Sequence, residues 1–377
     1  MHPCYIMASD AANEPLETRA IMRAARFHDR GDIRVEDIER TPVSNTDVRI
    51  EVEACGICGS DLHEYRHGPQ FTPENTHPKT DVSLPVPIGH EFSGRVSEIG
   101  ADVSRIEEGD AVVVEPNIPC HDCRYCEDGK THLCPNTTVV GWNTGDGGFA
   151  ENAVVPEQQV HILPENIRVE DGALVEPLAV GLHAVRQSGM CAGDTVAVFG
   201  CGPIGLTAIR AAKAAGAKHI FASEPNDTRR ETALDLGADD AIDPLETDAV
   251  EEITAATPDG VDVAFEFAGI DATFNAAVNS TKRDGTITVG SISDEETSTD
   301  LNDIVMTERT VIGTTCYGFP PQSFRTEFDA IIQSLAAGEI DTDPFVTGHI
   351  DLDDIAESGF DALLDPDTDH VKILVTS

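Results

Sequence analysis

Hydrophobic and polar residues alternate over short distances in the first part of the chain, a pattern typical of β-strands separated by turns. From Met22 onward, strands are predicted at residues 23–27, 33–35, 48–52, 95–99 and 112–114. Residues 66–87 contain five prolines and show little periodicity, so we expect a long surface loop there. The first part of the chain is therefore strand-rich.

From about Thr195 the pattern changes to an alternation of strands and helices. A buried strand at 195–199 leads through a glycine-rich turn to an alanine-rich helix at 206–215, and a strand at 219–223 precedes a helix at 227–236. Further strands are predicted at 261–267, 286–289 and 310–312, and helices near 248–256 and 271–282. This alternation predicts an α/β fold with a parallel, doubly wound sheet.

Length and charge refine this picture. At 377 residues the chain exceeds the usual size of one domain, so we expect two. It has 68 Asp and Glu against 25 Lys and Arg, a formal net charge of -43, which argues against nucleic acid and anionic membranes as partners. Because the acidic residues are spread along the whole chain, we interpret them as an adaptation to high salt, where the Debye length is about 3 Å at 1 M.

The first 21 residues are predicted to be an N-terminal extension. They carry Asp10, Glu14 and Glu17 and no apolar core, so they do not resemble a signal peptide. No uncharged apolar run is long enough to cross a bilayer. We therefore expect a cytoplasmic protein with reduced cysteines, in which clustered cysteines favour metal binding over disulfides.

One such cluster holds four cysteines within fifteen residues, Cys120, Cys123, Cys126 and Cys134. Four thiolates make a closed tetrahedral zinc site, and an iron–sulfur cluster is the competing use of the same ligands. No titratable neighbour suggests chemistry, so we predict a structural zinc. Four unrelated cysteines would be the alternative interpretation.

A second candidate site begins in the segment 55–63, which holds a thiol, a hydroxyl, a carboxyl and an imidazole: Cys58, Ser60, Asp61 and His63. Taken alone, the segment could equally be a loop with one buried cysteine. With His90 and Glu176 it provides sulfur, nitrogen and oxygen ligands and an open fourth position, as in catalytic zinc sites.

Each ligand in this set has an alternative interpretation. His90 could be a hydrogen-bonded core residue, and Glu176 could be an acid at a helix N-terminus beside Pro177. Asp61 is placed to orient His90 from behind.

The turn after the strand at 195–199 matches the dinucleotide-binding pattern Gly-x-Gly-x-x-Gly, with Gly200, Gly202 and Gly205. Pro203 and Ile204 complete this candidate coenzyme-binding turn. About twenty residues later, Glu224 ends the next strand, where a carboxylate can bind the ribose hydroxyls of NAD. Glu224 would repel a 2′-phosphate, so NADP is disfavoured, although Arg229 lies nearby as a further candidate coenzyme contact.

Together these motifs resemble those of the zinc-dependent medium-chain alcohol dehydrogenases, from about Met22 to the end of the chain. The resemblance implies a GroES-like, mostly β catalytic domain formed by residues 22–175 and 312–377, with a structural zinc lobe at 117–136. It also implies a Rossmann NAD-binding domain at 176–311, two zinc ions per subunit, and a homodimer or homotetramer. The stretches at 61–69, 77–78 and 84–94 look most like those of the butanediol dehydrogenase branch.

The resemblance also bears on the ligands and the reaction. Glu176 stands where liver-type members carry a second cysteine, and in some polyol enzymes the glutamate at Glu91 is the ligand instead, so the two remain rivals. The implied reaction is NAD-dependent oxidation of a secondary alcohol, for which we expect a vicinal diol such as 2,3-butanediol, converted reversibly to acetoin. Ser60 and His63 would relay the proton. A polyol, sugar or threonine dehydrogenase is the alternative, followed by a non-catalytic NAD-binding protein.

Overall fold

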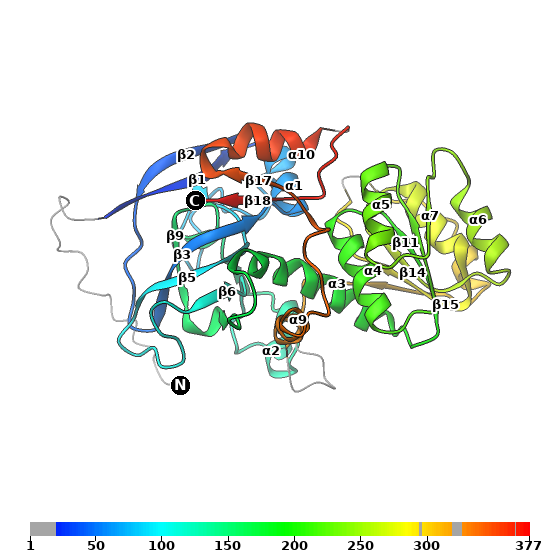
Figure 1. The fold of residues 1–377 in the computed structure, drawn as a ribbon, viewed down its shortest axis with the longest axis horizontal. Helices are drawn as coiled ribbons and strands as arrows, with labels where there is room; N and C mark the ends of the chain where they lie inside the picture. Colours follow the sequence, from blue (N-terminus) through cyan, green and yellow to red (C-terminus); the bar gives the residue numbers. More distant parts are fainter. Residues whose placement is uncertain (1–19, 294–295, 319–325, 366) are drawn as a thin grey trace.

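The computed structural model describes residues 20–293, 296–318, 326–365 and 367–377, and shows two domains side by side with helix α3 (Val175–Ser188) between them (Figure 1). Among these residues, no helix is long and apolar enough to span a membrane. Each described cysteine is a free thiol.

The first domain is built on a seven-stranded sheet that draws on both halves of the sequence. Its path runs β10 (Val160–Ile162), β6 (Ala111–Val114), β5 (Glu91–Ile99), β3 (Asp47–Gly56), β18 (Lys372–Thr376) and β17 (Val346–Asp351), with β9 (Asn152–Pro156) paired to β3. Because β18 pairs with β3, the C-terminal strands β17 and β18 complete a sheet whose other strands come from the first half of the chain.

Smaller elements surround this sheet. A three-stranded sheet consists of β2 (Asp32–Glu39), β1 (Ile21–Asp29) and β4 (Val86–Pro87), and a two-stranded one of β7 (Asn117–Ile118) and β8 (Thr138–Val139). The helices are α1 (Gly59–His67), α2 (Arg124–Glu127), α9 (Glu327–Ala336) and α10 (Ala362–Leu364). Phe27, Phe92 and Phe149 are fully buried in the core of this domain, and burial of each stabilises the fold by about 1.5–3 kcal/mol.

The second domain is a six-stranded, wholly parallel sheet in the order 3-2-1-4-5-6, which confirms the predicted doubly wound fold. Its strands are β13 (Asp240–Ile242), β12 (His219–Ser223), β11 (Thr195–Phe199), β14 (Val261–Glu266), β15 (Thr281–Val289) and β16 (Thr310–Gly313). Its helices are α4 (Pro203–Ala214), α5 (Asp227–Asp235), α6 (Ala249–Ala256), α7 (Asp271–Ser280) and α8 (Asn302–Val305).

The structure changes two details of the segment between 55 and 87. The alternative interpretation of 55–63 as a loop is wrong, because β3 continues through Gly56 and α1 begins at Gly59. The predicted loop is confirmed for residues 68–85, but α1 continues to His67 and β4 pairs with β1. Cys55 is a buried residue of β3.

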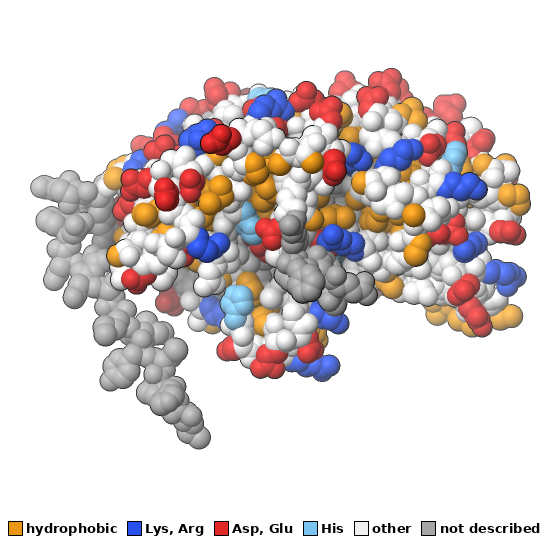
Figure 2. Space-filling view, turned by 60° about the horizontal axis from the view of Figure 1, so that its bottom comes forward, with side chains coloured by type: hydrophobic (Ala, Val, Ile, Leu, Met, Phe, Trp, Pro, Cys, Tyr) orange, Lys and Arg blue, Asp and Glu red, His pale blue; other side chains and the backbone are white. Residues whose placement is uncertain are grey.

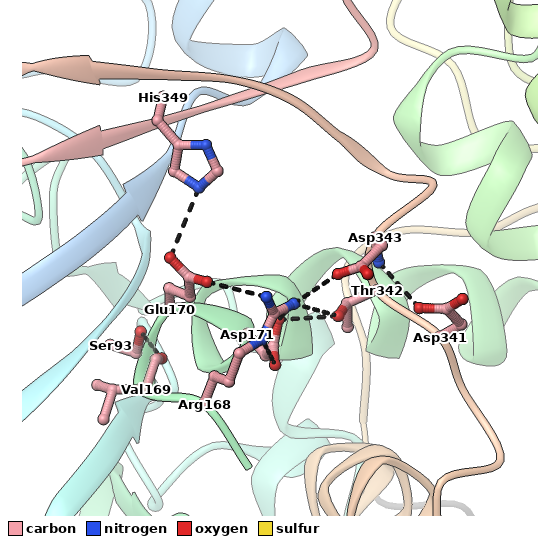
Figure 3. A network of polar contacts seen from close by, with 9 residues as sticks. All are labelled: Ser93, Arg168, Val169, Glu170, Asp171, Asp341, Thr342, Asp343 and His349. Atoms are coloured by element: carbon pink, nitrogen blue, oxygen red, sulfur yellow. Dashed lines mark hydrogen bonds and ion pairs between the residues drawn. The ribbon is translucent and has the colours of Figure 1, made fainter.

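Arg168 joins two chain segments that lie beside α3 (Figure 3). Its guanidinium donates to both carboxylate oxygens of Asp171, each at 2.8 Å, and to Asp343 at 2.7 Å. Thr342 donates to Asp171 at 2.8 Å, which closes the network. The Arg168 side chain is 56% exposed, so each ion pair contributes at most about 1 kcal/mol. The main effect of the network is therefore to fix the relative position of the two segments, and its contribution to the stability of the fold is small.

Acidic side chains are scattered over both domains on the face shown in Figure 2. Hydrophobic side chains gather between the domains on the same face. The acidity predicted from composition is thus a property of the surface of both domains.

Candidate metal and coenzyme site

The N-terminus of α1 brings the first candidate ligand into position. The Cys58 N–H donates to Asp61 Oδ2 at 3.0 Å, and the Asp61 N–H donates to the Cys58 carbonyl oxygen at 3.1 Å. These reciprocal bonds start the helix and fix the Asp61 side chain. The Asp61 carboxyl is fully buried, and its Oδ1 lies 3.3 Å from Nδ1 of His90. The structure therefore brings Asp61 behind His90, as the sequence predicted.

Around His90 the structure gathers a group of potential metal ligands. One donor atom each of Cys58, His90 and Glu91 lies within 4.8 Å of the others. Ser60 Oγ lies 3.4 Å from His90 Nε2. A thiol, an imidazole and a carboxylate in one buried group form a donor set that suits zinc.

The two rival carboxylates have different surroundings. Glu91 is fully buried and accepts two hydrogen bonds from Lys372 Nζ, at 2.9 and 2.6 Å. Lys372 is 2% exposed and also donates to the Ile57 carbonyl oxygen at 3.0 Å. A Cβ atom at Gly56 would overlap the Glu91 carboxylate, which explains the glycine there. The charge of Glu91 is thus already compensated by a lysine.

Glu176, on α3, is buried as well, but it lies outside the compact donor group. No ion pair joins it to Lys or Arg within the described residues. Burial, together with the charge of Glu91, raises the pKa of Glu176 to about 7, although the charges of His90 and Lys372 lower it. A metal ion would compensate a buried carboxylate that pairs directly with no cation.

The four cysteines of the lobe converge as predicted. Sγ of Cys123 lies 3.5 Å from that of Cys126 and 3.8 Å from that of Cys134, which lies 3.4 Å from Sγ of Cys120. A tetrahedron with zinc–sulfur bonds of about 2.3 Å has edges of about 3.8 Å. The lobe therefore fits zinc.

Aromatic residues that the sequence analysis did not single out cover the His90 side of the site. Trp142 contacts His90 edge-on with ring centroids 4.9 Å apart, and Phe71 stacks on Trp142 at 4.5 Å. The buried carboxylate of Glu64 holds Phe71 in place, because it accepts the backbone N–H groups of Gln70, Phe71 and Thr72 at 2.9–3.1 Å. The available sequence signal was that Trp142 is the single tryptophan of the chain.

The predicted relay residue His63 lies on α1 with Ser60, one turn away. Its Nε2 is 3.1 Å from Oε1 of Gln70, and its ring centroid is 6.0 Å from that of Phe71. His63 is partly exposed, whereas Asp61 is buried. The helix thus leads from the donor group toward solvent.

The glycine-rich turn opens a cavity of about 720 Å³ at the carboxyl ends of the parallel strands. Gly200 has a φ of 89°, and a Cβ at Gly205 would overlap the Gly200 carbonyl oxygen, so both positions require glycine. Gly202 faces open space, and Pro203 and Ile204 begin α4. The turn therefore leaves room for a pyrophosphate at a helix N-terminus.

Glu224 and Arg229 line the same cavity. The Glu224 carboxylate accepts hydrogen bonds from the backbone N–H groups of Cys201, at 2.7 Å, and Asn226, at 3.1 Å. Arg229 donates to the His370 carbonyl oxygen at 3.4 Å. Glu224 thus lies directly against the glycine-rich turn, where the sequence analysis predicted it.

Comparison with known proteins agrees with the description of the domain that holds the metal ligands and of the domain that holds the coenzyme crevice. Residues 44–165 match the alcohol dehydrogenase GroES-like domain, and residues 203–335 match the zinc-binding dehydrogenase family. The chain is 45% identical to (R,R)-butanediol dehydrogenase of Bacillus subtilis (strain 168), over 94% of this chain and 99% of the relative. It is 34% identical to sorbitol dehydrogenase of the same organism, over 88% of this chain and 91% of the relative.

A solved structure agrees as well. The crystal structure of 2R,3R-butanediol dehydrogenase from Bacillus subtilis superposes with a TM-score of 0.86 at 44% identity, covering 94% of this chain and 99% of the other.

A parallel coenzyme-binding sheet beside a β-domain with two groups of zinc donors defines a zinc- and nicotinamide-dependent dehydrogenase. The chain belongs to the zinc-binding alcohol dehydrogenase family.

Proposed function

We propose that this enzyme oxidises a small vicinal diol with NAD, converting 2,3-butanediol to acetoin, and catalyses the reverse reaction. The observation that carries the chemistry is the buried group of Cys58, His90 and a carboxylate with Ser60 beside it. The name of the relative at 45% identity supports the choice of diol.

We further propose that Cys58, His90 and Glu176 hold the catalytic zinc, while Lys372 holds Glu91 beside it. Glu176 is favoured because it is buried and forms no ion pair with Lys or Arg in the described part of the chain, whereas Glu91 already pairs with Lys372. Zinc bound there supplies a Lewis acid that lowers the pKa of a hydroxyl group. Cys120, Cys123, Cys126 and Cys134 hold the structural zinc.

The side chains around this centre move the proton and shape the pocket. Ser60 accepts the hydroxyl proton, and the imidazole of the partly exposed His63 passes it to solvent. Asp61 fixes the orientation of His90. Phe71 and Trp142 exclude water and limit the pocket to small substrates. NAD, when bound in the crevice, accepts the hydride.

A panel of purified alcohols, assayed with NAD and with NADP at high salt, tests the substrate. We expect the highest kcat/KM for 2,3-butanediol with NAD, because Glu224 opposes a 2′-phosphate. Sorbitol and threonine represent the second candidate function, which the sorbitol dehydrogenase relative favours. A higher kcat/KM for either of them would overturn the diol assignment.

Metal analysis tests the ligands. Cys58→Ser should abolish turnover and leave one zinc per chain, because the four-cysteine lobe does not involve Cys58. Two zinc ions per chain in this variant would refute the assignment. Glu176→Gln and Glu91→Gln, compared in the same way, decide between the two carboxylates.

Three wider properties complete the proposal: a cytoplasmic location, adaptation to high salt and a homodimer or homotetramer. The acidic surface of both domains supports the second. The homodimer or homotetramer is supported by strand β16, which lies at the edge of the parallel sheet, and by the exposed side chains of Leu301, Val305 and Met306 that precede it. Light scattering at high salt measures the assembly, and a monomer would contradict it.

A further inference from the structure

One contact between the zinc lobe and the rest of the protein is made by His132, which lies in the short helical turn Thr131–Leu133 between Cys126 and Cys134. The His132 ring packs directly on Gly318: a Cβ atom at Gly318 would overlap Nδ1 of this ring. The same ring meets His183 of α3 edge-on, with centroids 4.9 Å apart. One side chain of the lobe thus touches two segments that are distant in the sequence.

A buried carboxylate ties these two segments together. Glu327, 1% exposed at the start of α9, accepts the Gly318 N–H at 2.8 Å and lies 2.8 Å from His183 Nδ1. Arg186 donates to its other oxygen at 3.3 Å. Gly318 and His183 are therefore held by Glu327 from one side and covered by His132 from the other.

Both segments lead to the catalytic site. His183 lies seven residues after Glu176 on α3, so the two side chains share one face of the helix. Gly318 ends the segment 314–318, which leaves the coenzyme-binding sheet where the Thr314 N–H donates to the Val289 carbonyl oxygen at 2.9 Å. Within this segment, Tyr317 is buried and its ring packs at a tilt against that of Phe328, with centroids 4.7 Å apart. Cys316 packs against the core that contains Val175 and Leu178. The segment thus runs from the coenzyme crevice to the part of α3 that carries Glu176.

We propose that His132 is a positioning residue through which the four-cysteine lobe sets the place of segment 314–318 and of α3 at the catalytic site. The lobe then has a role in turnover as well as in stability. This inference rests on the proposed alcohol dehydrogenase function, because its effect is measured on the alcohol and on the coenzyme. It requires packing by the ring and no proton transfer by it.

The experiment uses the zinc-loaded full chain at high salt and exploits the missing Cβ of Gly318. Gly318→Ala pushes against the His132 ring, and the double variant Gly318→Ala with His132→Ala removes the obstacle. Gly313→Ala is the matched control, since a Cβ there meets nothing within 4 Å. His132→Phe keeps a ring, whereas His132→Ala does not. The readouts are kcat and KM for 2,3-butanediol and NAD, NADH affinity by fluorescence titration, and zinc per chain.

We expect Gly318→Ala and His132→Ala to lower kcat/KM by about tenfold or more with two zinc ions retained, because small displacements of substrate-positioning groups reduce rates strongly. Gly313→Ala and His132→Phe should stay within about threefold of the parent. The double variant should lose about as much kcat/KM as His132→Ala alone, because the two positions share one contact, whereas independent effects would multiply to a loss of about a hundredfold or more.

Equal kinetics for Gly318→Ala and Gly313→Ala would overturn the proposal, as would a double variant in which the losses of the two single variants multiply. If Gly318→Ala does not fold, the comparison of His132→Ala with His132→Phe decides, and equal activity of these two refutes the role of the ring. If the parent oxidises no diol, the proposed function fails, while NADH affinity across the variants still tests the positioning of the segment.

Discussion

The buried pair of Lys372 and Glu91 allows a quantitative prediction. Lys372→Met removes the cation and keeps most of the side-chain volume, so a fully buried carboxylate loses its only ion-pair partner among the described residues. At 2.6 Å and an effective dielectric constant of about 20, the attraction between the two charges is about 6 kcal/mol. Part of this attraction offsets the cost of burying both groups, so we expect a net destabilisation of about 3–5 kcal/mol.

Urea unfolding at high salt, followed by fluorescence, measures this change. Trp142 is the single tryptophan of the chain and contacts His90, so its emission reports on the domain that contains the pair. The matched control is Lys372→Met with Glu91→Gln, which replaces both charges and should recover most of the lost stability. The protein is measured both zinc-saturated and chelated, because a zinc ion near Glu91 would partly replace the lysine charge. A cost below about 1 kcal/mol in both states, or a double variant as unstable as the single one, would refute the reasoning.

Three further predictions concern pH, metal and salt. Burial lowers the pKa of His161, but hydrogen bonds and charges of Asp329 and Glu115 outweigh it and raise the pKa to about 9. Protonated His161 therefore adds up to about 3 kcal/mol to the free energy of unfolding below pH 6.5, and this contribution is lost as the pH rises through 9. The parent minus His161→Gln difference in unfolding free energy should therefore shrink between pH 6 and 10, and a constant difference would contradict this. Cys123→Ser should lower the zinc content from two per chain to one and reduce the melting temperature, and a retained second zinc would exclude Cys123 as a ligand. Finally, the melting temperature should rise from dilute buffer to multimolar KCl, because the net charge of -43 is then screened, and equal values would remove the case for salt adaptation.

The parallel sheet could be predicted because its signals are local. The strand at 219–223 was predicted with the bounds of β12, and the helix after it differs from α5 by one residue, since Asn226 caps it and Gly237 follows it. By contrast, α1 has no amphipathic pattern, and its start depends on the reciprocal bonds between Cys58 and Asp61. Hydrophobic periodicity along the sequence therefore could not predict this helix.

The partners of the site are separated too widely for sequence reasoning. Lys372 lies in an apolar strand 281 residues after Glu91, and nothing in its neighbourhood indicates an ion pair. Phe71 contacts Trp142 from a turn that the carboxylate of Glu64, seven residues earlier, holds by backbone hydrogen bonds. The residue types needed for zinc and coenzyme could be identified from their motifs, whereas the groups that orient them depend on tertiary contacts.

The place of β18 in the first sheet has a consequence for how the protein is made. This strand lies between β3 and β17 and carries Lys372, yet it is synthesised after the whole coenzyme-binding sheet. While the ribosome translates β11 to β16, the end of β3 at Cys55 and Gly56 lacks its partner strand β18, and Glu91 lacks its lysine. The parallel sheet, whose strands are contiguous in the chain, can form during translation, but the catalytic domain must wait for its last strand. The unpaired end of β3 must therefore be protected from incorrect pairing until β18 has been synthesised.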